Sequence, residues 1–570
     1  MKHPKTVLIF FPFVLLRTFS SFQRNRISSS LTIMAAVPFN SDSMLYKWAA
    51  HDSDDYHHFT PTEAVDIRQA LLVWYCSNRR KLPWRGDAPP FDGSTAIEHK
   101  KPKQDTSQTK LKSFFNPIRT TQKEQCNEVL TAIPVTGYSV WVSEIMLQQT
   151  RVEAVIPFYL KWMNRFPTVH DLAVASDDDV NSHWAGLGFY RRAKLMHQGS
   201  QTILADYNGH VPRTVTELLT IPGIGPYTAH AIASIAFDQP VAVVDGNVCR
   251  VLSRLKGIAN HIKAPILKDK LGWVLAQQIM DAGQGDHGNV NQALMELGAT
   301  YCAPSGTGIV KQDPLREWYQ STLLGAAFGS ERSRIAKHGL EHLPVEDYIS
   351  IVRKNGKACR LCDPNGISIV LNDMQDRYNA ATTTPTTLDC STFGHASIPI
   401  APPKTSKREE VLAVLALSCG DRWLFVKRPK QGLLAGQWEF PSVCVWDSAN
   451  ETTLKRKAGD KRTVVETVVP VVDTHVRSQT LDDVMNEFGM VTHRTALPSA
   501  EVHVFSHVRH TMWIEFGAVE EASDIPFWQG RALRWMTTDD MVKVGVTSGV
   551  RKVLNAVNDF GGRRTRTKKR

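Results

Sequence analysis

Hydrophobic positions recur along this chain with two different periods. Apolar residues have helical spacing in an amphipathic stretch over 62–84, and again with little interruption from Val140 to about Ala299. After Glu410 the pattern changes to short apolar runs, VLAVLAL, RWLFVKR, EVHVFSHV and MWIEFGAV, which are typical of strands. The chain is therefore predicted to hold an all-α domain followed by an α+β domain.

Changes in residue composition and in the hydrophobic pattern set the predicted domain boundaries. We place the helical domain at 62–302 and the strand-rich domain at 409–555. Residues 87–136 are polar and rich in Pro, Lys and Thr, which predicts an inserted or disordered loop. Residues 303–408 are weakly patterned and include the low-complexity run ATTTPTT, so they are predicted to be a connector.

Both ends of the chain are basic. The leader, 1–40, has Lys and Arg but no acidic residue, which is typical of organelle targeting, and the tail, 556–570, ends in GGRRTRTKKR. Three interpretations of the tail are open: a nuclear localisation signal, a DNA-binding segment or a solvated terminus without a function. We expect a nuclear or mitochondrial protein, with the plastid as an alternative. The apolar run in the leader is too short to span a bilayer, so no membrane association is expected, although the run is also compatible with the hydrophobic region of a secretory signal.

Composition narrows the class of partner. The 570 residues carry a net charge of +11, and the isoelectric point near 9.1 suits a polyanion. Nine cysteines, mostly scattered singly, do not form the pattern of a disulfide framework. A reducing compartment is therefore favoured, and a metal site becomes a candidate.

The string IPGIGPYTAHAIASIAFDQPVAVVDGNVCR, 221–250, combines a glycine-rich turn, a helix and an aspartate. Gly223 and Gly225 allow the backbone to approach a ligand closely, and the amides that open the next helix suit a phosphate group of DNA. Asp245 precedes a second helical pattern, so it is predicted to start a helix. It is either a catalytic carboxylate or an ordinary N-cap.

A lone carboxylate, Glu144, lies in the apolar helical pattern YSVWVSEIMLQQT. Apolar surroundings should raise the pKa of Glu144 and let it donate a proton near neutrality. Cleavage of a purine N-glycosidic bond needs such an acid on the base and a second carboxylate near the sugar cation. Glu144 and Asp245 form a candidate pair, although a surface salt bridge is the alternative for Glu144.

Together these motifs resemble the MutY-type adenine DNA glycosylases of the helix-hairpin-helix superfamily, over about 62–302 and again over about 409–555. The resemblance implies base excision repair of adenine mispaired with 8-oxoguanine, or with guanine, in double-stranded DNA. It assigns proton donation to Glu144, stabilisation of the sugar cation to Asp245 and support of the carboxylates to Asn247. It places Tyr227 with these catalytic residues, as a lining of the same pocket. It further implies that Arg80 and Trp84 hold the flipped adenine and that Gln149 and Tyr190 wedge into the duplex.

Residue 227 distinguishes two reaction types. Helix-hairpin-helix glycosylases that also cut the strand carry a lysine nucleophile at this place, because a Schiff base requires an amine. This chain has Tyr227, so the resemblance implies a monofunctional enzyme that leaves an abasic site. The alternatives are an endonuclease III-like lyase that acts on oxidised pyrimidines and a mismatch-binding protein without catalysis.

The cysteines depart from the family pattern. Family members usually hold a [4Fe-4S] cluster on cysteines spaced Cys-x6-Cys-x2-Cys-x5-Cys. Here Cys302 is followed only after 56 residues by Cys359 and Cys362, Ser368 stands at the fourth position, and Cys390 is the nearest substitute. Three alternatives follow: a cluster on these four cysteines, a zinc site at Cys359 and Cys362 as in some animal members, or no metal.

The string VKRPKQGLLAGQWEFPSV, 426–443, resembles the Nudix-like, MutT-related domain of the same family. The acidic box that nucleotide hydrolases use to bind magnesium does not follow it, so this domain is predicted to recognise rather than hydrolyse. The resemblance assigns contact with 8-oxoguanine to Phe505, Ser506 and His507. Without the resemblance, His507 would be an ordinary strand-end histidine.

A short partner motif lies in the polar insertion. Gln108, Leu111, Phe114 and Phe115 fit the pattern Q-x-x-L-x-x-F-F of sliding-clamp (PCNA) ligands. An apolar triplet in a polar loop has no neighbouring periodic element to pack with. We therefore predict clamp binding by an otherwise monomeric protein.

Overall fold

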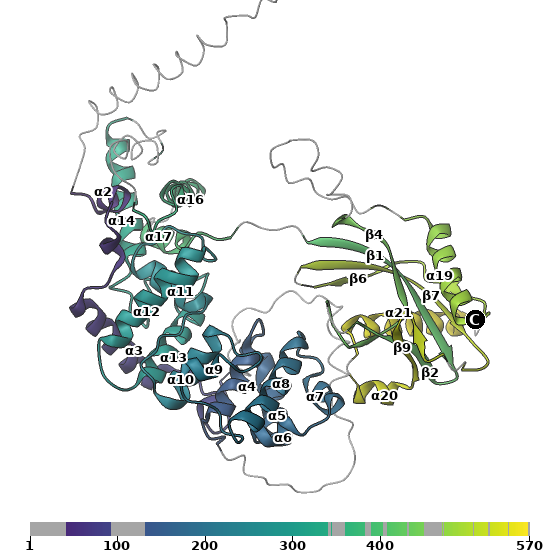
Figure 1. Ribbon diagram of the computed structural model, residues 1–570. Helices are drawn as coiled ribbons and strands as arrows, with labels where there is room; N and C mark the ends of the chain where they lie inside the picture. The colour runs from purple at the N-terminus through teal and green to yellow at the C-terminus, as the bar shows by residue number, and fades with distance from the viewer. Residues whose placement is uncertain are drawn as a thin grey trace, which may run out of the picture. The chain divides into compact units, whose positions relative to one another are not determined.

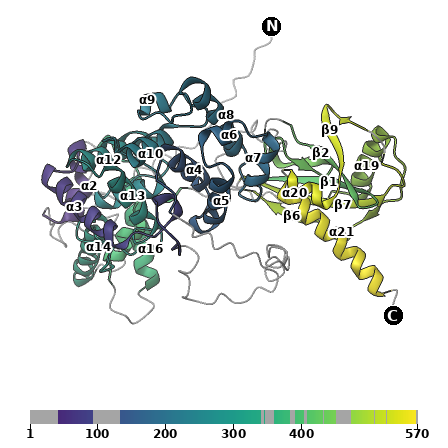
Figure 2. The same ribbon diagram turned by 90° about the horizontal axis from the view of Figure 1, so that it is seen from below.

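The computed structural model is shown in Figure 1 and, turned by 90°, in Figure 2. It describes residues 42–92, 132–339, 344, 359–381, 389–402, 407–429, 432–449, 470, 472–505, 507–522, 525–544 and 546–567. The chain divides into two compact units. The first comprises residues up to 79 with 233–402, and the second comprises 80–232 with 403–570. The leader, the clamp motif at Gln108, Leu111, Phe114 and Phe115, and Ser506 lie outside the described residues.

Helices alone make up the described part of the first unit. Its central helix is α11 (Gly246–Leu255), in which every residue from Val248 to Leu255 is buried. Helices α12, α13 and α14 contact this helix, and α3 contributes side chains to the same apolar core. The bounds are α2 (Met44–Ala50), η1 (Asp54–His57), α3 (Pro61–Asn78), η3 (Ile266–Leu271), α12 (Gly272–Asp281), α13 (His287–Ala299), α14 (Gln320–Lys337), α16 (Gly366–Ala381) and α17 (Ser391–Ser397).

The segment predicted as a connector contributes three of these helices. Helices α14, α16 and α17 pack with α2 around a second core that includes Trp48, Phe328 and Met374. Part of this packing is not visible in the hydrophobic pattern, because α14 contacts α17 at a small residue, Gly325. A Cβ atom at Gly325 would lie 2.3 Å from the carbonyl oxygen of Cys390.

The helical part of the second unit confirms the periodicity seen in the sequence. Helix α4 (Gly137–Leu147) starts with a capping box between Thr136 and Ser139, and Gly199 of α8 (Arg191–Asp206) lets α8 pack on Trp141 of α4. The other bounds are η2 (Pro83–Arg85), α5 (Val152–Arg165), α6 (Val169–Ala173), α7 (Asp177–Trp184), α9 (Val215–Leu218) and α10 (Pro226–Phe237), whose last residues belong to the first unit.

A mixed sheet forms the rest of the second unit, as expected for an α+β domain. Its strands are ordered β5-β7-β1-β2-β9-β8, with β3 on β2, β4 on β1 and β6 on β7. β1 (Arg408–Cys419) pairs in parallel with β7 (Val508–Ala518). The remaining bounds are β2 (Arg422–Lys427), β3 (Trp438–Glu439), β4 (Ser442–Asp447), β5 (Thr495–Ala496), β6 (Glu501–Val504), β8 (Phe527–Trp528) and β9 (Arg531–Met536).

Helices cover both faces of this sheet. Val414 and Ala416 of β1 face the core under α20 (Thr538–Lys543) and α21 (Ser548–Thr567), whereas Leu415 and Leu417 face the core under α19 (Thr474–Phe488) (Figures 1 and 2). Alternation of side chains along a strand therefore explains why the VLAVLAL run is apolar throughout. Among the described helices, none has the length and apolarity to span a bilayer.

Candidate functional site

Glu144 and Tyr227 are in direct contact. Glu144 lies in the last turns of α4 and is only 7% exposed. Tyr227, in the first turn of α10, donates its hydroxyl proton to Oε2 of Glu144 at 2.7 Å. Two residues that are far apart in sequence and were both predicted for the site thus meet, and the carboxyl group is held by a specific hydrogen bond.

The glycine-rich turn has the conformation that its sequence predicts. Gly223 has a φ of +85°, and a Cβ atom there would lie 2.8 Å from Cβ of Leu195, so only glycine fits. Gly225 has no atom within 4 Å of a Cβ position, and it directly precedes the first residue of α10. Open backbone at a helix N-terminus is suited to a DNA phosphate.

Asp245 is both an N-cap and a half-buried carboxylate. Its Oδ1 accepts a hydrogen bond from the amide of Val248 at 2.7 Å, and its Oδ2 accepts one from Nδ2 of Asn247 at 2.8 Å. Burial raises the pKa of Asp245, while these hydrogen bonds and the charge of Arg250 oppose the rise. The N-cap interpretation and the catalytic interpretation are therefore compatible.

Arg250 contacts Asn247, which in turn donates a hydrogen bond to Asp245. Arg250 was not singled out from the sequence. Its Nη2 donates to Oδ1 of Asn247 at 2.8 Å and to the carbonyl of Gly298 at 2.8 Å, and its Nε donates to the carbonyl of Cys302 at 2.9 Å. The available signal was the pair of arginines in the otherwise apolar string VCRVLSRL. A buried guanidinium needs acceptors, and these fix the side chain of Asn247.

Two turns expose the side chains expected to enter the duplex. Gln149 follows α4, has a φ of 57° and is exposed. In the other turn Phe189 has a φ of 49° and is 44% exposed. Its neighbour Tyr190 is less exposed, burial raises its pKa, and its hydroxyl accepts a hydrogen bond from the amide of Gly186 at 3.3 Å. The structure thus presents Phe189, which the sequence did not single out, more openly than the predicted Tyr190.

Arg192 joins the two turns. Its Nη1 donates to the carbonyl of Gln148 at 2.7 Å and its Nη2 to the carbonyl of Gly188 at 3.1 Å. The guanidinium also lies 5.4 Å from the ring of Phe189. Burial lowers the pKa of Arg192 to about 10, so the side chain stays charged at neutral pH.

Arg80 and Trp84, which are predicted to hold the flipped adenine, lie near each other in sequence, with Trp84 in η2 and Arg80 three residues before it. Trp84 is nearly buried, with its ring edge-to-face against Tyr159 of α5 at 5.5 Å. Arg80 is half-buried, and its carbonyl accepts a hydrogen bond from Nη1 of Arg85 at 3.0 Å. Trp84 is therefore held as a rigid wall rather than as a mobile stacking group.

Two of the residues predicted to read 8-oxoguanine, Phe505 and His507, lie between β6 and β7. The amide of Phe505 donates to the carbonyl of Val508 at 2.8 Å, and the ring of Phe505 packs edge-to-face on His503 at 4.4 Å and His510 at 5.0 Å. His507 is exposed. Phe505 borders a cavity of about 40 Å³, too small for a nucleobase. This cavity therefore does not serve as a pocket for the base.

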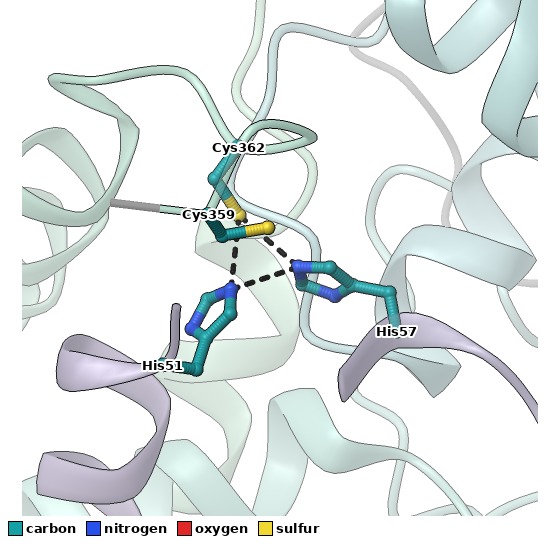
Figure 3. A group of neighbouring side chains, drawn as sticks. All are labelled: His51, His57, Cys359 and Cys362. Atoms are coloured by element: carbon teal, nitrogen blue, oxygen red, sulfur yellow. Dashed lines mark hydrogen bonds between the residues drawn. The ribbon is translucent and has the colours of Figure 1, made fainter. Parts of the chain in front are cut away.

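Two of the predicted metal-binding cysteines come together, but with histidines. Cys359 and Cys362 share a group with His51 and His57, and the ligand atoms of the four residues all lie within 4.8 Å of one another (Figure 3). The sequence did not single out either histidine, because about three hundred residues separate them from the cysteines. The only ligand spacing visible in the sequence is the Cys-x2-Cys pair, because the two histidines come close to it only in three dimensions.

The other two predicted cysteines have different surroundings. Cys302 is fully buried, and its Sγ accepts a hydrogen bond from Nη1 of Arg254 at 3.3 Å and lies 3.9 Å from Nε2 of His395. Cys390 is the residue before α17, and its Sγ would lie 2.9 Å from a Cβ at Gly329. The space next to Cys302 is thus taken by Arg254 and His395, which does not fit a [4Fe-4S] cluster on the four predicted cysteines.

Comparisons with known proteins agree with the two predicted domains. Residues 142–276 match the HhH-GPD superfamily of base excision DNA repair proteins, and residues 413–556 match the NUDIX domain. The chain is 35% identical to the adenine DNA glycosylase of Rattus norvegicus over 395 residues, which is 68% of this chain and 62% of the relative. It is 32% identical to the adenine DNA glycosylase of Schizosaccharomyces pombe over 409 residues, which is 69% of this chain and 73% of the relative.

Among solved structures, a non-covalent endonuclease III–DNA complex shares 21% identity with a TM-score of 0.29, over 35% of this chain and 86% of that chain. The chain thus spans about three fifths of the rat relative and nearly three quarters of the yeast relative. With a base-excision domain and a NUDIX domain in one polypeptide and these enzymes as relatives, the chain belongs to the adenine DNA glycosylase family.

Proposed function

We propose that this protein hydrolyses the N-glycosidic bond of adenine paired with 8-oxoguanine, or with guanine, in double-stranded DNA. The observation that carries the proposal is the hydrogen bond between Tyr227 and Glu144. It holds a buried carboxyl group on α4 against the first turn of the helix that follows the glycine-rich turn. Adenine is a poor leaving group unless its ring is protonated, and Glu144 is the proton donor in this proposal.

The proposed reaction has two halves. The bond between the sugar carbon and the adenine nitrogen breaks, its electron pair goes to the base, and Glu144 gives a proton to a ring nitrogen. Tyr227 donates to Oε2, so the second oxygen of Glu144 is the one to carry the transferable proton. Asp245 stabilises the sugar cation, and a water oxygen then adds to the sugar and loses a proton, which leaves an abasic site.

We propose that the reaction ends there, without strand cleavage. A Schiff base would need an amine at the hairpin, and Tyr227 stands at that position with its hydroxyl bound to Glu144. An endonuclease III-like lyase is therefore the less favoured enzyme. A mismatch-binding protein without catalysis is disfavoured by the hydrogen-bonded pairs around Glu144 and Asp245.

The test is single-turnover adenine release from a duplex with one adenine opposite 8-oxoguanine. We expect release by the wild-type chain, loss of at least about a thousandfold in rate with Asp245→Asn, and strand breaks only after alkali. Tight binding without release would refute the glycosylase proposal. Strand breaks without alkali would refute only the proposal that the enzyme does not cleave the strand.

Further parts of the proposal concern recognition and location. We propose that Phe505, Ser506 and His507 contact 8-oxoguanine, which the exposure of His507 supports. The clamp motif supports a partnership with a sliding clamp, and the basic leader and tail support a nuclear or mitochondrial location. A monomer is the proposed state of the protein.

A further inference from the structure

Two histidines contact the ring of Phe505, and a glutamate contacts one of these histidines. They are His503 of β6, His510 of β7 and Glu410 of β1. We propose that these three residues hold the Phe505 ring in place and thereby set the preference for 8-oxoguanine over guanine opposite adenine. None of them touches DNA in this proposal, so each is a positioning residue. The inference rests on the proposed recognition of 8-oxoguanine.

The two histidines are neighbours across a strand pair. β6 and β7 pair antiparallel, with His503 directly opposite His510. Side chains of directly opposed residues lie on the same face of a sheet. The ring of Phe505 lies edge-to-face against both, with its centroid 4.4 Å from that of His503 and 5.0 Å from that of His510. Packing of this kind restricts the orientation of a ring as well as its place.

Apolar packing alone does not fix Phe505, because its side chain borders an unfilled space. The cavity of about 40 Å³ is lined by Phe505 and both histidines, together with apolar residues that include Leu412 and Met512. A side chain next to such a space has no neighbouring atoms on that side and therefore loses contacts there. The two histidines are thus needed to restrict the ring.

Glu410 holds His510 from the neighbouring strand. β1 pairs in parallel with β7, and Glu410 is in register with His510. Oε2 of Glu410 lies 3.0 Å from Nε2 of His510, and Oε1 of Glu410 lies 2.9 Å from Nη2 of Arg408. The contact with His510 lowers the pKa of Glu410, although partial burial opposes this, so the carboxylate is charged at neutral pH. A charged acceptor holds an imidazole more firmly than a neutral one.

His503 is held by α21. Its Nε2 lies 2.9 Å from Oγ of Ser548, the first residue of that helix. Burial, with the charge of Lys552 and the nearby His510, lowers the pKa of His503 to about 4, so the ring is neutral at neutral pH. Among the described residues, Nδ1 of His503 has no hydrogen-bond partner. A buried nitrogen without a partner lowers stability, so the contact with Phe505 explains this histidine better than a contribution to stability does.

The start of β1 also holds the backbone of Phe505 and His507. Nζ of Lys407 donates to the carbonyl of Phe505 at 3.0 Å, and the amide of Arg408 donates to the carbonyl of His507 at 3.0 Å. One strand end therefore holds both the backbone of these residues and, through Glu410, the ring of Phe505. 8-Oxoguanine differs from guanine only by an oxygen on C8 and a proton on N7, so discrimination requires contacts placed to within a fraction of an ångström.

The test uses the full chain and compares single-turnover adenine release from two duplexes, with 8-oxoguanine or guanine opposite the adenine. The preference is the ratio of the two rates. We expect Glu410→Ala and His510→Ala each to lower this ratio by about tenfold, mainly through slower release opposite 8-oxoguanine. Glu410→Gln keeps a hydrogen-bond acceptor for His510 and should restore most of the ratio.

The matched control is Glu515→Ala. Glu515 is a similarly buried carboxylate of the same sheet, and its Oε2 lies 2.9 Å from Nε of Arg494. It is five residues after His510 on β7, so its side chain lies on the opposite face of the sheet. This control should lose stability and keep the ratio. An equal fall of the ratio in Glu515→Ala and Glu410→Ala would overturn the inference.

A second measurement does not depend on catalysis. With para-fluorophenylalanine at position 505, the fluorine NMR resonance reports the neighbouring histidine rings. Glu410→Ala should shift and broaden this resonance, and Glu515→Ala should leave it unchanged. An unchanged resonance in Glu410→Ala would overturn the inference. Equal release from both duplexes by the wild-type chain would refute the proposed recognition and the inference with it, whereas a wild-type preference that Glu410→Ala and His510→Ala leave unchanged would refute the inference alone.

Discussion

At the residue scale, the ionisation of Asp245 is a balance between burial and its partners. Burial raises its pKa, while hydrogen bonds from Val248 and Asn247 and the charge of Arg250 lower it. The proposed reaction needs the carboxylate form, so the rate should rise with pH through this raised pKa. Arg250 touches both Asn247 and the backbone of the neighbouring elements, which makes it a positioning residue.

The first prediction concerns Arg250→Gln. The charge of Arg250 lowers the pKa of Asp245, so its loss should raise that pKa further. The acid limb of the pH–rate profile should therefore move to higher pH. The hydrogen bond to Asn247 is also lost, and adenine release at neutral pH should slow by about tenfold or more. Single-turnover release measured across the pH range checks both effects.

The matched control is Arg254→Gln. Arg254 shares the carbonyl of Cys302 with Arg250, and the described contacts of its guanidinium are with Cys302, Ala303 and Ile398 rather than Asn247. This control should lose stability and keep the acid limb in place. An equal shift of the limb in both variants would contradict the positioning role of Arg250.

The second prediction concerns Tyr227→Phe. The ring stays, but the hydrogen bond to Oε2 of Glu144 is removed, which leaves a buried carboxyl oxygen without that donor. Adenine release should slow by about tenfold, while affinity for the duplex stays nearly constant. Binding and single-turnover rates measured side by side test this, and an unchanged rate would remove Tyr227 from the proposed machinery.

At the element scale, the ends of α4 and α8 are coupled through one side chain. Arg192, in the first turn of α8, donates to the carbonyls of Ile145 and Gln148 at the end of α4 and to the carbonyl of Gly188. These carbonyls have no partner within a helix, so the guanidinium acts as a C-cap for α4. The exposed side chains of Gln149 and Phe189 are thereby held on two joined turns.

The third prediction is that Arg192→Ala weakens duplex binding and lowers stability. Several charge-assisted hydrogen bonds are lost from a largely buried site, which should cost about 2–4 kcal/mol of unfolding free energy. Arg191→Ala is the control, because Arg191 is exposed and its loss changes the net charge equally. Denaturant unfolding and duplex-binding measurements test this. An equal decrease in stability and in affinity in both variants would show that the loss of one positive charge alone explains the effect.

At the scale of the whole molecule, function is distributed over separate parts of the chain. The candidate acid and hairpin lie in the helical part, and the candidate reader of 8-oxoguanine lies on the sheet. The predicted sliding-clamp motif belongs to the insertion in the sequence between η2 and α4. Such separation predicts that partner binding can be removed without loss of chemistry.

The fourth prediction tests this separation. Phe114→Ala combined with Phe115→Ala should abolish capture of the chain by immobilised sliding clamp, because the apolar anchors of the motif are removed. Adenine release should be unchanged. Retained capture would disprove the motif, and a parallel loss of excision would show that the insertion also serves the catalytic part.

Features that depend on local pattern could be predicted from the order of the residues. Helical and strand periods predicted both domain types, and the order of glycine turn, helix and aspartate predicted the hairpin and the N-cap position of Asp245. Glycine at 223 is required by a backbone conformation, and such a requirement is visible in a single residue. The resemblance to a family placed Tyr227 and Glu144 in the same pocket, but it did not predict the hydrogen bond between them.

Features that depend on long-range packing could not be predicted in this way and are visible only in the folded chain. It showed that described parts of the weakly patterned connector are helices, whose apolar side chains, such as Phe328 and Met374, form a core with α2, and in which Gly325 permits the close approach of α17. It showed that Arg250 and Arg192 bind backbone carbonyls, which no side-chain pattern encodes. It also brought His51 and His57 to Cys359 and Cys362, because ligands of a metal need proximity in space and not in sequence.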